Sequence, residues 1–222
     1  MAPVKTSRRE KAQATRTAIL RAAQAEFVEN GFHGATITAI AKRAKVAPQT
    51  VYFVFHTKAE LISAVIDTAV MGEDDPKTPE ETPWFAAMLA EPDPAECVRM
   101  FVRGAGEVYA RASFVGEVLH AAALTDEEVR STHEHHEELR HTGYRSVVEM
   151  LAEKGELRPG LTIDTATDVF MTIYGDGTYT VLRTERGWSH EQVMDWLCDV
   201  LPGMLLSAPA GRAARRSSAS SR

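Results

Sequence analysis

The chain has 222 residues, of which 44% are hydrophobic and 25% are charged. This composition excludes wholesale disorder, and no apolar run approaches the length needed to span a bilayer. The first residues, MAPVKTSRREK, lack the apolar core of a signal peptide, and the cysteines Cys97 and Cys198 have no paired spacing. We therefore expect a cytoplasmic protein with buried, reduced thiols and one large or two small domains.

Charge is divided unevenly along the chain. Residues 1–60 hold ten lysine or arginine residues against four acidic ones, whereas residues 61–207 hold eleven against twenty-seven. The net charge of −6 conceals this basic head on an acidic body. The division suggests that the N-terminal end meets a polyanion, although chance clustering of solvated charge would give the same pattern.

Helical spacing of apolar residues dominates the N-terminal third of the chain. The pattern predicts four helices, at about 15–30, 36–44, 48–54 and 57–70. Asn30-Gly31 supplies a stop signal for the first helix, and Pro48 suits the first turn of the third helix, where a backbone amide needs no partner. The polar, basic residues 1–12 are predicted to form a flexible arm.

The remainder of the chain also shows helical patterns, after a polar connection at residues 72–83 and a break at residues 91–94. These patterns cover about 94–112, 114–124, 126–155, 164–186 and 189–206. Thr125 and Glu128 have the spacing of a capping box ahead of the longest helix. Strand signals are almost absent, so the predicted fold class is all-α. The tail, GRAARRSSASSR, is of low complexity and is predicted to be disordered.

Two short helices joined by a tight turn, next to a longer first helix, form a helix-turn-helix pattern, although a generic helical hairpin can show the same spacing. The stretch TRTAILRAAQAEFVENGFHGATITAIAKRAKVAPQTVYFVFHTKAEL is more specific. It resembles the N-terminal domain of the TetR family of transcriptional regulators over roughly residues 15–65. The resemblance is carried by Ala-x-x-x-Phe-x-x-x-Gly-Phe at the close of the first helix, Thr-x-x-x-Ile-Ala in the second, Thr50-Val51-Tyr52 in the third, Phe55 and Thr57-Lys58.

The resemblance implies an N-terminal three-helix helix-turn-helix DNA-binding domain and a C-terminal helical domain for ligand binding and dimerisation. The expected divisions are a basic arm at 1–12, the DNA-binding domain at 13–60, the helical domain at 61–207 and the tail at 208–222. The expected partners are a palindromic operator in double-stranded DNA, a second copy of the chain and an unidentified small-molecule effector that releases a repressor. No cofactor and no membrane partner are expected.

DNA contacts are assigned through the same resemblance. Tyr52 and Lys58 fall on positions that hold backbone phosphates, and Thr50 and Phe53 on the DNA-facing side. Base reading is expected from Gln49 at adenine edges, and from Pro48 and Phe53 at thymine methyls. The arm residues could track phosphates or belong to a merely soluble tail. The complete set of candidates is Lys5, Arg8, Arg9, Thr36, Thr38, Lys45, Pro48, Gln49, Thr50, Tyr52, Phe53 and Lys58.

Two residues depart from the family's usual pattern. Lys45 stands where glycine is common in the turn, and lysine costs about 1 kcal/mol more than glycine if the backbone there is left-handed. Ala47 stands where serine often caps the third helix, and the loss of a cap also costs about 1 kcal/mol. We expect Lys45 to recover some DNA affinity through a phosphate contact.

In the family, the middle helices enclose a ligand and the last two helices pair across a two-fold axis. The pocket candidates, each of which could equally be ordinary core, are Trp84, Phe85, Met100, Phe101, Phe114, His133, His136, Met150, Phe170 and Met171. The dimer-interface candidates are Gly175, Gly177, Trp188, Val193, Trp196, Leu197, Val200, Leu201 and Met204. The run HEHHEELRH at 133–141, with His120 nearby, raises the hypothesis of a metal site, but solvated helix surface is the simpler interpretation and no metal is predicted.

Two rival classes of function remain open. An enzyme is disfavoured, because no nucleophile motif, glycine-rich phosphate loop or paired-carboxylate arrangement stands out. A ligand-independent regulator or an architectural DNA-binding protein would carry the same basic head. Whether a regulator represses or activates depends on where its operator lies relative to a promoter.

Overall fold

The structure is a computed structural model that describes residues 7–72 and 76–208. In these ranges the chain is all-α, as predicted, with one isolated bridge between Leu157 and Leu206. None of the described helices is long and apolar enough to cross a membrane. The chain divides into two units: the first comprises the chain up to Thr78 together with Val108–Glu137, and the second comprises Pro79–Glu107 and the chain from Glu138 onward.

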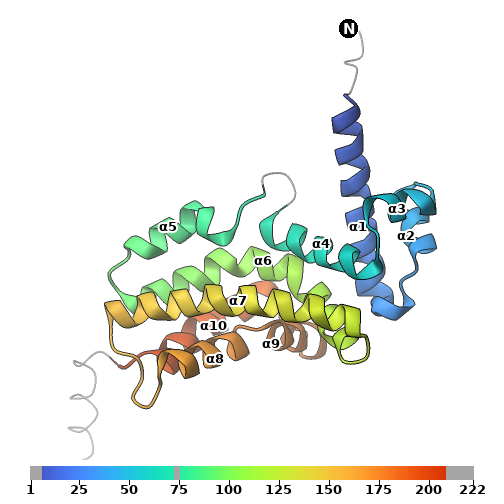
Figure 1. Cartoon of the computed structure of the whole chain (residues 1–222). Coiled ribbons are helices and arrows are strands. Elements are labelled where there is room, and N and C mark those ends of the chain that lie inside the picture. The colour runs from blue at the N-terminus through green and yellow to red at the C-terminus, as the bar shows by residue number, and fades with distance from the viewer. Residues whose placement is uncertain (1–6, 73–75, 209–222) are drawn as a thin grey trace, which may run out of the picture. The chain divides into compact units, whose positions relative to one another are not determined.

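The first unit begins with four helices, α1 (Arg8–Gly34), α2 (Ile37–Ala44), α3 (Pro48–Val54) and α4 (Lys58–Met71). Figure 1 shows α2 and α3 packed on one side of the C-terminal part of α1. Ser7 caps α1: its hydroxyl accepts a hydrogen bond from the Glu10 amide, and the Glu10 carboxylate accepts one from the Ser7 amide. The prediction of a flexible arm is therefore wrong for residues 8–12, whereas Lys5 lies outside the described residues.

The core of the first unit follows from the helical spacing of its apolar residues. Ile19, Phe27, Ile40 and Val51 are fully buried, and Phe55 is 3% exposed. Burial of such large side chains contributes roughly 1.5–3 kcal/mol each, which fastens α2 and α3 to α1. The start positions predicted for α2, α3 and α4 are confirmed, because Thr36 and Thr57 cap α2 and α4 and Pro48 is the first residue of α3.

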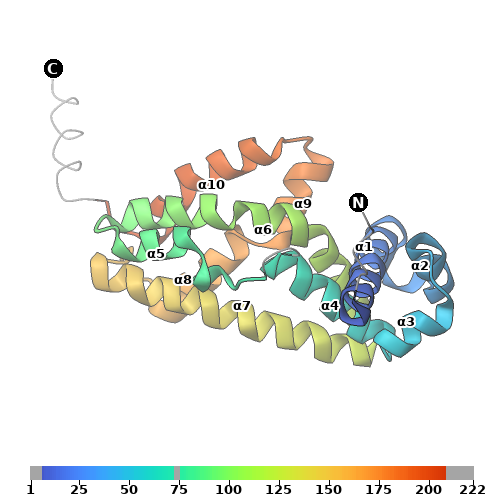
Figure 2. The same cartoon turned by 90° about the horizontal axis from the view of Figure 1, so that it is seen from above.

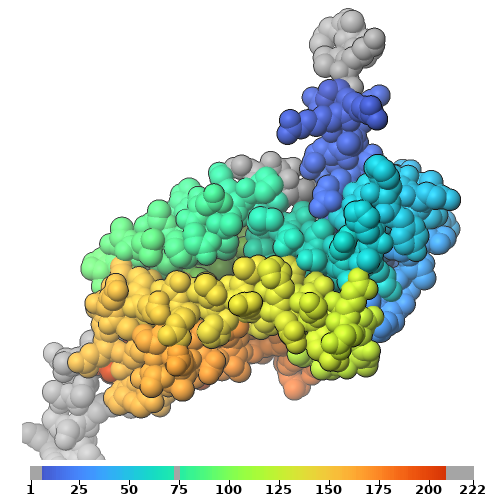
Figure 3. Space-filling model, in the orientation of Figure 1, coloured from blue at the N-terminus to red at the C-terminus, as the bar shows by residue number. Residues whose placement is uncertain are grey.

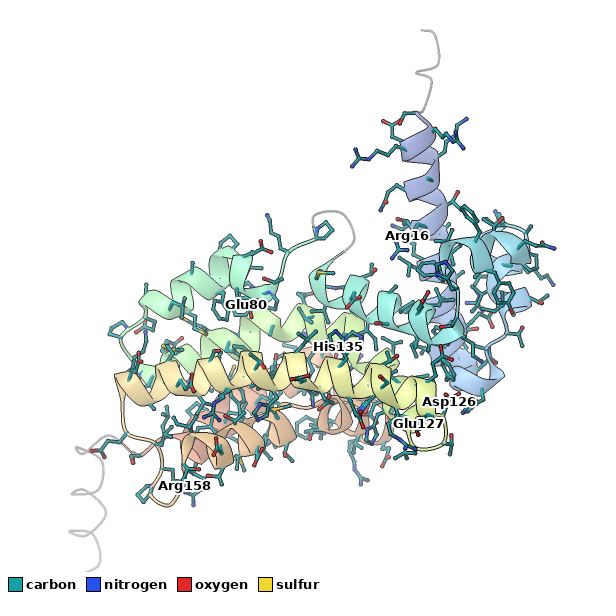
Figure 4. All side chains as sticks on the ribbon, viewed as in Figure 1. Arg16, Glu80, Asp126, Glu127, His135 and Arg158 are labelled. Carbon is teal, nitrogen blue, oxygen red and sulfur yellow. The ribbon has the colours of Figure 1, made fainter. Side chains whose placement is uncertain are left out.

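Two long helices, α6 (Pro94–Ala123) and α7 (Glu127–Lys154), each contribute residues to both units. The break predicted near residue 113 is absent, because α6 continues through this position and Ser113 is buried. The predicted capping box of α7 is also wrong. Asp126 is the cap instead, because its carboxylate accepts hydrogen bonds from the amides of Glu128 and Val129 (Figure 4).

The second unit contains the 3₁₀ turn η1 (Pro79–Glu81), α5 (Pro83–Ala90), α8 (Ile163–Ile173), α9 (Asp176–Thr180), the π turn η2 (Val181–Glu185) and α10 (His190–Leu205). Figure 2 shows α5, α8 and α10 around the first half of α6. Helix α5 was not predicted, because its apolar run is short and lies between two proline-rich breaks. The helix predicted at 164–186 is interrupted at Gly175, where the backbone is extended and a Cβ atom would lie 2.5 Å from the Met171 carbonyl oxygen. Gly175 is therefore required by this break in the helix.

Aromatic rings fill the core of the second unit. The Phe101 ring makes edge contacts with Trp84, Tyr144, Phe170 and Tyr174, at centroid distances of 5.2–6.0 Å. The Tyr174 hydroxyl donates to the Val102 carbonyl oxygen at 3.0 Å, and burial raises the pKa of this phenol well above its ordinary value. These contacts satisfy the polar ends of rings that would otherwise be costly to bury.

The two cysteines are free and buried, as predicted. Burial raises the pKa of both thiols, so both are protonated at neutral pH.

Candidate nucleic-acid interface

Helix α3 presents its polar and aromatic side chains to solvent. Phe53 is 85% exposed and Tyr52 is 54% exposed, and Pro48 and Gln49 are also exposed, whereas Val51 between them is completely buried. Large rings in water are unfavourable for a helix that packs only within its own chain. The exposed face of α3, the helix so labelled in Figure 1, is therefore the strongest candidate for contact with another molecule.

The turn between α2 and α3 has the left-handed backbone conformation that makes lysine costly at position 45. Lys45 adopts the left-handed conformation, with φ 58° and ψ 40°, and is the only non-glycine residue with positive φ in the described chain. Its amide donates to carbonyls at the end of α2, and the Val46 amide donates to the Ala41 carbonyl oxygen at 3.0 Å. Ala47 provides no side-chain cap for α3, because alanine has no polar side-chain atom. The turn therefore carries both of the expected costs, and leaves the Lys45 side chain exposed.

Helix α2 is held to α1 by an ion-pair cluster. The Arg43 guanidinium donates to the Glu29 carboxylate at 2.9 Å and pairs with Glu26 at 2.9 Å. The hydrogen bond from Arg43 lowers the pKa of Glu29, and the same bond raises the pKa of Arg43. Arg43 therefore fixes α2 in place, while the exposed Thr36 and Thr38 lie at the N-terminal end of α2.

The Lys58 side chain makes hydrogen bonds and a ring contact within its own chain. Its ammonium group donates to the carbonyl oxygens of Phe32 at 2.7 Å and Ala35 at 3.2 Å, and lies 4.3 Å from the centre of the Phe32 ring. Burial lowers the pKa of Lys58, and the charge of Asp126 opposes this shift. A phosphate contact by Lys58 would have to compete with these bonds, which join the first turn of α4 to the end of α1.

The junction between α3 and α4 contains a capping arrangement that the sequence-based prediction overlooked. The Thr57 hydroxyl accepts from the Glu60 amide at 3.0 Å, and the Glu60 carboxylate accepts from the His56 amide at 3.0 Å. Hydrogen bonds from His56 lower the pKa of Glu60. The Thr-x-x-Glu spacing was a readable signal for this junction.

The predicted pocket residues do not come together at one cavity. Phe114, His133 and His136 belong to the first unit, and the other candidates belong to the second. A cavity of about 330 Å³ in the second unit is lined by Glu80, Phe85, Leu89, Leu139, Thr142, Gly143, Ser146 and Val147. Phe85 alone among the candidates reaches it. The candidates Phe101 and Phe170 instead belong to the buried aromatic core.

Two histidines of the histidine-rich run contact side chains on different helices. His133 Nε2 lies 3.2 Å from His120 Nδ1 on α6, and His136 Nε2 lies 3.0 Å from the Ser63 hydroxyl on α4. Burial lowers the pKa of His136. Across residues 7–72 and 76–208, no group of three or more His, Cys, Asp or Glu side chains is arranged to hold a metal ion.

Six of the predicted dimer-interface residues lie on two sides of α10, whereas Gly175, Gly177 and Trp188 precede that helix. Val193, Leu197 and Leu201 are at most 2% exposed in a single chain, so the prediction that they contact a second copy is wrong: they belong to the core of their own unit. Trp188, Trp196, Val200 and Met204 are partly exposed, and the last three recur every four residues on the outer face of α10.

The second half of α1, α2, α3 and the first half of α4 match a family model. Residues 19–65 fit the model described as "Bacterial regulatory proteins, tetR family". The chain belongs to the TetR family of transcriptional regulators. The matched range contains all of the DNA-binding candidates except Lys5, Arg8 and Arg9.

Individual relatives agree with this family assignment. The transcriptional regulator UidR of Escherichia coli K12 is 51% identical over 55 residues, which cover 25% of this chain and only 28% of UidR. The transcriptional repressor BepR of Brucella suis is 26% identical over 189 residues, covering 82% of this chain and 88% of BepR. The structure of FadR from Bacillus subtilis, in complex with stearoyl-CoA, has a TM-score of 0.67 at 17% identity and covers 85% of this chain and 98% of FadR. The FadR comparison shows a shared fold.

Proposed function

We propose that this TetR-family protein is a sequence-specific DNA-binding repressor that binds a palindromic operator as a homodimer and is released by a small molecule. The observation that carries the proposal is the exposed face of α3. Val51 and Phe55 are buried and anchor the helix to the core, while Gln49, Tyr52 and Phe53 are exposed. A helix with that division fits the major groove of DNA, which is about 12 Å wide.

The side chains of α3 would divide the work of recognition. Gln49 would pair with an adenine edge, and Pro48 and Phe53 would contact thymine methyl groups. Tyr52 and Lys45 would bind phosphates, which set the register of the helix without reading sequence. Arg8 and Arg9, exposed in the first turn of α1, would add phosphate contacts that salt weakens.

Dimerisation would use the outer face of α10, formed by Trp196, Val200 and Met204. A dimer places two α3 helices at a fixed separation, so each can enter one of two successive major grooves on the same side of the duplex. The second unit would then be the ligand-binding and dimerisation domain.

Release by a small molecule is supported by the stearoyl-CoA that FadR binds on the same fold, and repression is supported by the repressor description of BepR. In this chain, α7 is the helix that would carry the effect of a bound ligand to α4. Its residues beyond 138 line the cavity of the second unit, and His136 on the same helix contacts Ser63 of α4. A ligand that displaces α7 would thereby bias the position of α4, provided it binds the released conformation more tightly.

The base-reading assignment is tested by three variants in a binding assay against a panel of duplexes. Gln49→Ala should relax the preferred sequence at one position of each half-site, at a cost of about 1–3 kcal/mol for the preferred base. Tyr52→Phe should weaken binding to all sequences alike, because it removes a phosphate contact. Lys58→Ala should weaken binding mainly by loosening the joint between α1 and α4. An unchanged base preference in Gln49→Ala would show that α3 is read differently.

A further inference from the structure

The cavity in the second unit has the size of a small-molecule site. It lies between α5 and α7, has a volume of about 330 Å³, and falls in the range of cavities that bind organic ligands. In the space-filling view the surface is furrowed between α5, in green, and the second half of α7, in yellow to orange (Figure 3). The aromatic core next to Phe85 is packed, whereas this cavity offers a ligand open space in the second unit.

Two walls of the cavity are apolar. Phe85 and Leu89 come from α5, and Leu139 and Val147 come from α7. Leu89 is 49% exposed and Leu139 is 57% exposed, although both are large hydrophobic residues. A ligand with an apolar body would cover these side chains and gain the free energy of removing their surface from water.

The polar groups of the cavity are hydrogen-bond acceptors. The Thr142 hydroxyl donates its proton to the Glu138 carbonyl oxygen at 2.9 Å, and the Ser146 hydroxyl donates to the Thr142 carbonyl oxygen at 3.1 Å. Each hydroxyl has a single proton, so only oxygen lone pairs remain for a ligand. The third polar group is the Glu80 side chain, which comes from η1 ahead of α5 (Figure 4). The lining residues include no lysine, arginine or histidine.

We propose that this cavity binds an apolar organic cation, with a protonated amine against Glu80 and the Thr142 and Ser146 oxygens. An ammonium group supplies donors without acceptors and carries the charge that complements the Glu80 carboxylate. A carboxylate or phosphate of the same size would face three acceptors and a like charge. The inference rests on the proposed function only for the claim that the ligand is the effector, since binding is measured without DNA.

A matched set of probes separates charge from shape. 4-Phenylbutylamine, 4-phenylbutanol and 4-phenylbutyrate share a phenyl ring on a short alkyl chain and end in an ammonium, a hydroxyl and a carboxylate at neutral pH. Titration calorimetry with the full chain should rank them amine, then alcohol, then carboxylate. Equal binding of the three, or tighter binding of the carboxylate, would overturn the proposed ligand class.

Two variants locate the site. Gly143→Leu fills the cavity from α7: a Cβ atom at Gly143 would lie 3.9 Å from the Glu80 carboxylate, so the added side chain has room and the helix loses an unfavourable glycine. It should reduce amine affinity by about tenfold or more, the affinity ratio that corresponds to about 1.4 kcal/mol, with an undiminished melting temperature. Glu80→Gln changes an exposed side chain without endangering the fold. It should weaken the amine by about fivefold and leave the alcohol unchanged, whereas the neighbouring Glu81→Gln should alter neither.

The results also distinguish this inference from the proposed function. Sequence-specific DNA binding together with amine affinity that both Gly143→Leu and Glu80→Gln leave intact would overturn the ligand site and leave the regulator standing. Amine binding that follows the predicted order but never changes DNA affinity would support the site and contradict its role as the effector site.

Discussion

The core of the second unit and the outer face of α3 in the first unit use the same aromatic residue types in opposite ways. In the second unit, Phe101, Phe170 and Tyr174 are buried, contact one another, and the tyrosine hydroxyl has a carbonyl partner. On α3 of the first unit, Tyr52 and Phe53 stand in solvent. The difference shows that an aromatic residue indicates a core only when its neighbours can surround it. Tyr52, Phe53 and Phe55 lie within four positions at the end of one short helix and cannot all turn inward.

The largest expected effect is on stability, when the loss of a buried aromatic ring is compared with the loss of an exposed one. Phe170→Ala removes a fully buried ring and should lower the free energy of unfolding by about 3–5 kcal/mol. Phe53→Ala removes a ring that is 85% exposed and should change it by less than about 0.5 kcal/mol. Urea unfolding measures both. If Phe53→Ala proved as destabilising as Phe170→Ala, the α3 ring would have a structural role in the free protein.

The outer face of α10 gives the next largest effect. Trp196→Ala should weaken the proposed dimer by about 2 kcal/mol or more, because a tryptophan near the centre of an interface typically contributes that much. Analytical ultracentrifugation over a concentration series measures the shift. Leu124→Ala, at a 70% exposed leucine in the first unit, serves as the control and should leave dimerisation unchanged. Equal dimerisation of both variants would place the interface elsewhere.

Lys45 connects stability with DNA affinity in the first unit. Lys45→Gly should raise the free energy of unfolding by about 1 kcal/mol, because glycine adopts the left-handed conformation without strain. If Lys45 binds a phosphate, the same change should reduce the slope of log affinity against log salt by about 1. Lys42→Ala, an exposed lysine on α2 with helical geometry, is the control for charge alone. No gain in stability would mean that the turn tolerates lysine without strain.

The smallest expected effect concerns pH and His136. Burial lowers its pKa in the folded chain, so the unfolded chain binds more protons between that value and the ordinary value of about 6.5. Stability should therefore fall as pH falls through this window, although Asp67 on α4 opposes the shift and His133 and His135 reinforce it. In His136→Gln the fall between pH 7 and pH 5.5 should be shallower, whereas in the exposed His135→Gln it should be nearly that of the parent. An identical slope in His136→Gln would assign the pH dependence to other groups.

The helix-turn-helix region was predictable from sequence because local signals determine it. Caps at Thr36 and Thr57, a proline at the start of α3 and a periodic core specify the elements within about 50 residues. The inward turn of Lys58 was not predictable, because its partners at Phe32 and Ala35 depend on how α1 and α4 pack.

The candidate ligand site was harder to predict, since its residues come from separate helices. Glu80 and Gly143 lie far apart in sequence and carry no motif. The predicted pocket consisted mainly of aromatic and methionine residues, but most of the aromatic rings belong to the core. The sequence-based prediction also assigned both sides of α10 to the dimer interface. The helical period identifies a stripe of apolar residues without saying which partner covers it.

The most direct test is selection of bound duplexes from a random DNA pool with the purified protein at near-physiological salt. The proposed function predicts enrichment of an inverted repeat whose half-sites are about one helical turn apart, 10–10.5 base pairs from centre to centre, or a multiple of that. The same selection with Gln49→Ala should lose preference at one position of each half-site. Enrichment without any shared sequence would contradict a sequence-specific dimer and leave only electrostatic binding to DNA.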